Sequence, residues 1–335
     1  MRSAALVLLL ATAAHAQVVA TVGRDIAVAH DLRVELFDAT GRRIWTADGV
    51  DQPSRIATNN DRIAVIDSFA NTAVVIDRST GRMERMRTGE TPVDAVFFGR
   101  DLYVLTRDAS RLDVLGPRSL FLGFVQLAPD PAFLRAANGK LYVYSRLDGV
   151  VQEITPGTLR IGRTLTLAPF ASDFEIDGRI GYLVYPADAK LRTFTLSTMK
   201  RGSDIGVGAV PVDLAVTARA NALSASRLAI ADPSAKRVWI AEGEQSVARA
   251  IARGFIRGLL GLGLFSPKSS DFPSGVDRVV TRGSTTVVYD STTQTLYRVK
   301  GKNVQVVARD LPSGAFAVTD SGLVLWQNGA LRLIH

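Results

Sequence analysis

The chain has 335 residues, of which 47% are hydrophobic and 21% charged, so its composition is that of a folded globular protein. It contains no cysteine and three histidines, which excludes disulfide scaffolds, thiol nucleophiles and multi-histidine metal centres. The formal net charge is +8. The cations are scattered rather than clustered among aromatic residues, and this pattern argues against a nucleic-acid partner.

The N-terminal residues have the pattern of an export signal. A positive start at Met1-Arg2 is followed by an apolar stretch over residues 4–14 and by the small-x-small sequence Ala14-His15-Ala16. We therefore predict a cleaved signal peptide over residues 1–16 and a single domain over residues 17–335. A cysteine-free exported chain fits a bacterial periplasmic or secreted protein.

A short apolar motif then recurs along the chain, most often at intervals near 40 residues. Each copy begins with a strand pattern that comes directly after a proline or small residue. A turn, a very apolar second strand, a third strand and a polar fourth strand then follow in order. This period is typical of propeller blades with four strands each. The residue at the centre of the apolar strand, here named the column residue, is Val28, Val65, Val104, Val143, Leu183, Ile230, Val288 or Leu325.

The repeat predicts an all-β fold, a single β-propeller of about eight four-stranded blades, with seven blades as the alternative. The pattern contains roughly 31 strands, because only about three follow Pro312. The last blade is thus expected to be incomplete, or to be shared between the two ends of the chain. Contacts between the ends would close the ring and remove an exposed sheet edge.

Two segments resemble a known repeat. Residues 91–96 (TPVDAV) followed by 102–104 (LYV), and residues 71–77 (NTAVVID) followed by 80–81 (TG), resemble the YVTN-type β-propeller repeat. The resemblance extends over nearly the whole domain and implies the propeller fold. A fold-level resemblance of this kind leaves the function open.

Residues 248–274 interrupt the repeat. Arginines recur every four residues there, with apolar residues on the opposite side, so we predict an amphipathic basic helix within an insertion between late blades. The helix could cover the propeller, dock a partner or contact an anionic membrane surface over residues 248–265. The residues predicted to dock a partner are Arg249, Arg253, Phe255 and Arg257.

The innermost strand of each blade lines the central channel, so its first residues should form a rim at one mouth. The aligned residues are Val18, Arg55, Asp94, Phe133, Asp173, Asp213, Asp277 and Gly314 or Ala315. The polar ones form the predicted ligand-binding rim: Arg55, Asp94, Asp173, Asp213 and Asp277.

The rim aspartates permit two interpretations. Carboxylates on consecutive blades could bind Ca²⁺ or another divalent cation, and the predicted metal ligands are Asp173, Asp213 and Asp277. Alternatively, these aspartates cap backbone N–H groups at the start of each strand. A second column, Asp67, Asp232 and Asp290, follows the apolar strand and is predicted to cap turns.

Two functions are compatible with these features. The leading hypothesis is an exported, monomeric binding or scaffold protein that presents one face or its channel mouth to a protein or small ligand. The alternative is a metal-assisted, lactonase-like hydrolase, in which the rim aspartates hold a cation and Arg55 orients an anionic substrate. No catalytic residue can be assigned, since the chain has no Gly-x-Ser-x-Gly nucleophile elbow.

Overall fold

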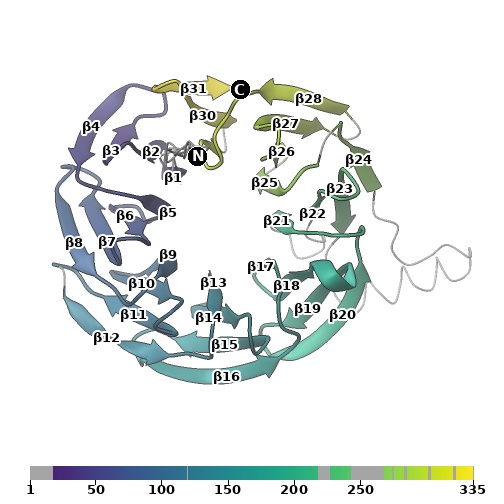
Figure 1. The fold of residues 1–335 in the computed structure, drawn as a ribbon. Coiled ribbons are helices and arrows are strands. Elements are labelled where there is room, and N and C mark those ends of the chain that lie inside the picture. Colours follow the sequence, from purple (N-terminus) through teal and green to yellow (C-terminus); the bar gives the residue numbers. More distant parts are fainter. Residues whose placement is uncertain are drawn as a thin grey trace, which may run out of the picture.

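The computed structural model describes residues 18–118, 120–217, 227–242, 268–273, 275–282, 285–300, 303–319 and 322–334. These residues form 31 β-strands and one short 3-10 helix, Pro186–Asp188. The strands make eight antiparallel sheets arranged in a ring, seven with four strands and the last with three (Figure 1). The structure therefore confirms an eight-bladed all-β propeller, and the alternative of seven blades is wrong.

The innermost strand of each blade faces the centre of the ring (Figure 1). These strands are β1 (Val18–Val22), β5 (Pro53–Thr58), β9 (Pro92–Phe98), β13 (Pro131–Ala137), β17 (Asp173–Ile176), β21 (Asp213–Thr217), β25 (Arg278–Arg282) and β29 (Phe316–Val318).

The second strand of each blade carries the column residue, and all eight column residues are fully buried. Valine and isoleucine predominate here because branched side chains fit a pleated surface that is covered on both faces. These strands are β2 (Asp25–His30), β6 (Arg62–Asp67), β10 (Asp101–Thr106), β14 (Lys140–Ser145), β18 (Ile180–Tyr185), β22 (Arg227–Asp232), β26 (Thr285–Asp290) and β30 (Leu323–Gln327).

The third and fourth strands complete each blade outward, and the fourth is the most exposed. The third strands are β3 (Arg33–Phe37), β7 (Thr72–Asp77), β11 (Arg111–Leu115), β15 (Val150–Thr155), β19 (Lys190–Thr195), β23 (Arg237–Glu242), β27 (Thr295–Lys300) and β31 (Ala330–Ile334). The fourth strands are β4 (Arg43–Asp48), β8 (Met83–Arg87), β12 (Phe121–Gln126), β16 (Arg160–Thr166), β20 (Lys200–Gly206), β24 (Lys268–Asp271) and β28 (Asn303–Ala308).

The hydrophobic core lies between blades rather than within them. One cluster joins Val28 of the first blade to Tyr289 of the seventh and Leu325 of the eighth, and another joins Val34 of the first blade to Val65 of the second. A blade is a single twisted sheet with two apolar faces, so each blade needs a neighbour on both sides to exclude water. The core is therefore continuous only when the ring is closed.

The ring closes without an exchange of strands, because β1–β4 and β29–β31 form separate sheets. The backbone N–H of Val19 donates to the carbonyl of Gly314 at 3.0 Å. The Trp326 ring lies 4.5 Å from the His30 ring and 5.7 Å from the Phe37 ring, measured between centroids. Among the described residues the last blade has three strands and shares none with the first, which confirms the prediction of an incomplete last blade rather than a shared one.

The predicted helical insertion is not borne out. Residues 268–271 form strand β24, which pairs with β23 and completes the sixth blade. This pairing covers the edge of β23 that would otherwise be open. The predicted partner-docking residues Arg249, Arg253, Phe255 and Arg257 lie outside the described residues, as does the predicted signal peptide. Within the described ranges, no helix is long and apolar enough to span a bilayer.

Candidate functional site

The register of the sheets defines the channel rim. In each blade one residue at the start of the innermost strand lies opposite the residue that follows the column residue. These eight rim residues are Val18, Arg55, Asp94, Phe133, Asp173, Asp213, Arg278 and Ala315. Arg55, Asp94, Asp173 and Asp213 thus occupy the predicted positions.

Asp277 is not at the rim, and the alignment of the seventh blade was wrong by one residue. Its carboxylate accepts hydrogen bonds from the hydroxyl and the backbone N–H of Ser291, while Arg278 takes the rim position. Spacing would have revealed this, because seven of the eight rim residues, Arg278 included, precede their column residue by ten positions. The exception is Asp213, whose blade contains extra residues before β22.

The rim aspartates join neighbouring blades. One carboxylate oxygen of each accepts the backbone N–H that lies one residue past the rim position of the next blade. The pairs are Asp94 with Leu134 (3.1 Å), Asp173 with Leu214 (2.9 Å) and Asp213 with Val279 (2.6 Å). These side chains therefore cap backbone N–H groups, and each capped N–H belongs to the adjacent blade.

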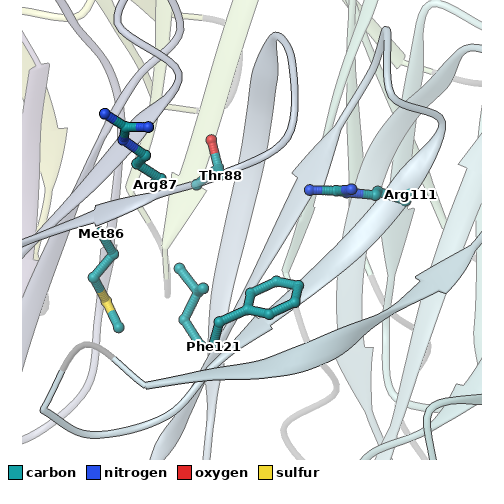
Figure 2. A pocket seen from close by; sticks show the side chains of 6 residues that line it. Met86, Arg87, Thr88, Arg111 and Phe121 are labelled. Atoms are coloured by element: carbon teal, nitrogen blue, oxygen red, sulfur yellow. The ribbon is translucent and has the colours of Figure 1, made fainter.

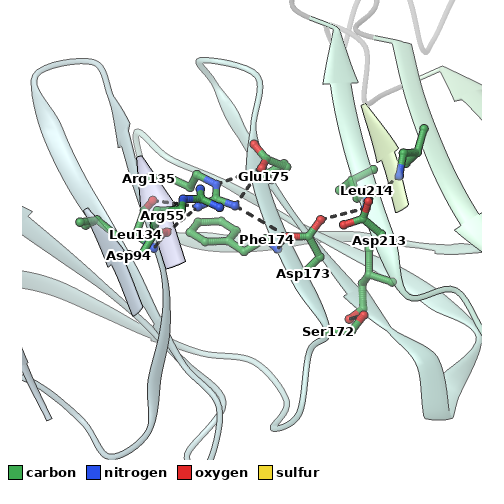
Figure 3. Close-up of polar contacts among 12 residues, drawn as sticks. Arg55, Asp94, Leu134, Arg135, Ser172, Asp173, Phe174, Glu175, Asp213 and Leu214 are labelled. Atoms are coloured by element: carbon green, nitrogen blue, oxygen red, sulfur yellow. Dashed lines mark hydrogen bonds and ion pairs between the residues drawn. The ribbon is translucent and has the colours of Figure 1, made fainter. Parts of the chain in front are cut away.

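Arg135 connects the aspartates into a network (Figure 3). It lies on β13, two residues beyond the rim residue Phe133, so both side chains lie on the same face of the strand. Its Nη1 lies 3.0 Å from Asp94 and its Nε 3.0 Å from Glu175, and its Nη2 is 3.7 Å from Asp173. Sequence reasoning missed Arg135 and Glu175, although both stand two residues after a predicted rim position.

Together these side chains make a belt of positive and negative charges across six blades. Arg55 extends it on one side, with Nε 3.0 Å from Asp94, and Arg278 lies next to Asp213 on the other. We call this set the rim belt: Arg55, Asp94, Arg135, Asp173, Glu175, Asp213 and Arg278. Arg55 is exposed, with 48% of its side chain accessible, and the side chain of Glu175 is 31% exposed.

Two carboxyl groups of the rim belt, those of Asp173 and Asp213, are perturbed by burial and by each other. Burial and the neighbouring charge of Asp213 raise the pKa of Asp173 to about 7, against the opposing effect of Arg135. Burial also raises the pKa of Asp213, whose side chain hydrogen-bonds to Asp173. The two carboxyl groups therefore share a proton near neutral pH, and one such proton makes a belt of three arginines and four acids electrically neutral.

The predicted metal set is not assembled. Asp173 and Asp213 face each other and accept backbone N–H groups, while Asp277 is bonded to Ser291 away from them. Among the described residues, no group of three or more histidine, aspartate or glutamate side chains is arranged to hold a metal ion.

The second aspartate column caps turns, as predicted. Asp67 accepts the backbone N–H of Phe69 and Ala70, and Asp290 accepts those of Thr292 and Thr293. Asp232 likewise accepts the N–H of Ala235 and, from the loop that enters its blade, that of Ala209. Burial alone would raise the pKa of Asp232, but these backbone hydrogen bonds outweigh it and the pKa is lowered.

Comparison with known proteins supports the fold alone. No protein-family model matches the chain and no curated protein resembles it in sequence, so the YVTN resemblance stays a prediction. BamB from Moraxella catarrhalis is similar in structure, with a TM-score of 0.67 at 11% identity over 93% of this chain and 91% of that one.

Two further solved structures show how varied the proteins with this architecture are. The dihydro-heme d1 dehydrogenase NirN gives a TM-score of 0.70 at 12% identity, over 92% of this chain and 68% of that one. A chain of a mitotic checkpoint complex gives 0.60 at 11% identity, over 82% and 84%. The chain is thus an eight-bladed β-propeller, and the fold is compatible with both binding and catalysis.

Proposed function

We propose that this protein is an exported binding or scaffold protein, whose propeller presents a rigid surface to a partner. The observation that supports the proposal is that the rim carboxylates are hydrogen-bonded to neighbouring blades. Asp94, Asp173 and Asp213 each accept a backbone N–H of the next blade with one carboxylate oxygen, so these rim residues link neighbouring blades. A ring locked in this way keeps its outer surfaces in fixed relative positions, which favours recognition of a partner.

A propeller chain of similar structure is part of a mitotic checkpoint complex, which supports a role in protein assembly for this fold. Export is supported by the N-terminal pattern of residues 1–16. The mass of the intact protein recovered from cells tests it directly, and we expect a chain that begins at Gln17. A full-length mass would contradict export by cleavage.

A second candidate function, an acid–base hydrolase, is supported by the Asp173–Asp213 pair. Two adjacent carboxyl groups that share a proton near pH 7 are a common source of general acid–base catalysis. Arg55, the exposed cation of the rim belt, would then orient an anionic substrate.

One experiment distinguishes the binding function from the hydrolase function. The tagged protein is chemically crosslinked in intact cells and purified, and in parallel the purified protein is assayed against a panel of lactones and esters with and without divalent cations. The binding proposal predicts a stoichiometric crosslinked partner and no turnover. Turnover that is lost in the Asp173→Asn, Asp213→Asn double variant would overturn it in favour of the hydrolase.

A further inference from the structure

The outer strand of the third blade, β12, differs from the outer strands of the other blades. Its sequence, Phe121–Gln126, contains no charged residue. Four large apolar side chains at or just before this strand are 42–57% exposed: Leu120, Phe121, Leu122 and Phe124.

Outer strands are the free edges of the blades, and edges are ordinarily protected by charged residues. The outer strands β4, β8, β16, β20 and β24 all contain charges. Only β28 shares the absence of charge, and its one large exposed apolar residue is Val306. Among the described outer strands, β12 is thus the edge best suited to pair with an added strand.

A groove adjoins this edge. The part shown in Figure 2 lies between the second and third blades, whereas residues of the second blade alone line the rest. It consists of two cavities of about 360 and 560 Å³ that share Arg87 and Thr88. Met86, Leu115 and Phe121 supply its apolar surface.

The groove is positively charged. The charged residues that line it are Arg85, Arg87 and Arg111, and no carboxylate lines either cavity. Arg111 is neutralised by Asp113 at 2.6 Å, and Arg85 lies 3.8 Å from Asp51. The side chain of Arg87 is exposed and has no hydrogen bond or ion pair within the described part of the chain. The groove therefore offers an uncompensated cation beside an apolar strand edge.

We propose that β12 and this groove bind an extended segment of a partner protein in which acidic and apolar side chains alternate. The segment adds to the third blade as a fifth strand, its apolar residues lie on the exposed side chains of β12, and a carboxylate pairs with Arg87. The inference rests on the proposed binding function and names the partner's chemistry. A second copy of this chain fits less well, because its groove would bring arginines against arginines.

The test measures binding of a fluorescent synthetic peptide in which valine and phenylalanine alternate with glutamate. A peptide of the same design with lysine in place of glutamate is the charge control. We expect the acidic peptide to bind at least about tenfold more tightly than the basic one. The variants Arg87→Glu and Phe124→Asp should each weaken acidic-peptide binding by about tenfold or more, whereas Val306→Asp on β28 should not.

Several outcomes would overturn the proposal. These are equal binding of the two peptides, unchanged binding by Arg87→Glu and by a second edge variant, Leu122→Asp, or self-association in light scattering that Phe124→Asp abolishes. Binding to phosphatidylglycerol vesicles that needs Arg87 and displaces the peptide would assign the surface to a membrane instead. All substituted side chains are exposed, and circular dichroism melts verify that the variants fold.

The same variants separate this inference from the proposed function. If Arg87→Glu and Phe124→Asp still capture the crosslinked partner in cells, the binding function stands and the docking surface is wrong. If the wild-type protein captures no partner, the binding function itself fails.

Discussion

Asp94 joins three blades through its two carboxylate oxygens. Oδ1 lies 3.0 Å from Arg55 of the second blade and accepts the N–H of Ala95 in its own blade. Oδ2 accepts the N–H of Leu134 and a hydrogen bond from Arg135, both in the fourth blade. The side chain is buried, so its removal would leave several of these groups without an acceptor in a place that water reaches poorly.

We therefore expect Asp94→Ala to lower the free energy of unfolding by about 3 kcal/mol, the range for breaking a buried charge pair. Asp277→Ala is the matched control, because its contacts lie at an exposed turn, and a change within about 0.5 kcal/mol is expected. Urea unfolding followed by circular dichroism measures both. Equal losses in the two variants would contradict the inter-blade role of Asp94.

The raised pKa of Asp173 leads us to expect that the stability of the protein depends on pH. Its pKa is raised from 3.8 to about 7 in the folded protein, so the folded state keeps a proton that the unfolded chain releases near pH 4. The unfolded state binds fewer protons over this interval, and stability therefore falls as the pH rises, by at most about 1.4 kcal/mol per pH unit.

The variant Asp173→Asn tests this directly. Asparagine has no ionisable proton, resembles the neutral carboxyl group and can still accept the N–H of Leu214. We expect its melting temperature to decline less than that of the wild type between about pH 5 and pH 8. The control variant Asp277→Asn should retain the wild-type decline, and parallel curves for all three proteins would assign the decline to other groups.

At the scale of elements, the connections between blades fit closely against the turns within them. Gly149 ends the turn between β14 and β15 with a φ of +63°, and its carbonyl accepts the N–H of Leu167. A Cβ at this position would lie 2.2 Å from the carbonyl carbon of Ala168, in the segment that leads to the fifth blade. Only glycine permits this approach, because the nearest atoms, in Ala168 and Pro169, all belong to the backbone.

We expect Gly149→Ala to reduce the free energy of unfolding by about 3 kcal/mol, from overpacking added to the strain of a positive φ. Gly157→Ala isolates the second effect. Gly157 also has a positive φ, of +81°, but a Cβ there would meet nothing within 4 Å, so a loss of about 1 kcal/mol is expected. Chemical denaturation of both variants measures the difference, and equal losses would show that the close contact with Ala168 is not maintained.

At the scale of the whole molecule, stability depends on the closure of the ring. The first and last blades share no strand, so their contact relies on side-chain packing and few backbone bonds. Trp326 is central to this contact, because its ring touches both His30 and Phe37 and is itself buried. A defect here would expose apolar faces of two blades at once.

Trp326→Ala should therefore destabilise the protein by about 3–5 kcal/mol, the usual cost of deleting a buried aromatic side chain. Phe69→Ala removes an aromatic ring that is 78% exposed, and its effect should stay within about 0.5 kcal/mol. Thermal melts compare the two variants. A small effect at Trp326 would show that the ring closes by other contacts.

The blade architecture can be predicted from local sequence patterns alone. The spacing of Val28, Val65 and their equivalents reflects local strand patterning, which a chain expresses whatever surrounds it. The same count favoured eight blades and a last blade that is incomplete or shared, and the structure selected eight blades with a three-stranded last sheet. The turn-capping role of Asp67, Asp232 and Asp290 was also predictable, since each caps a backbone N–H within three residues of itself.

The contacts of the rim residues, in contrast, depend on how the blades pack against one another. Asp94 and Leu134 are 40 residues apart, and they meet because the ring places one blade against the next. Register separates Arg278 from Asp277, because a shift of one residue turns a side chain to the opposite face of a strand. Here the ten-residue spacing to Val288 already indicates Arg278 in the sequence. The groove beside β12 also needs two blades, so no local pattern in either one reveals it.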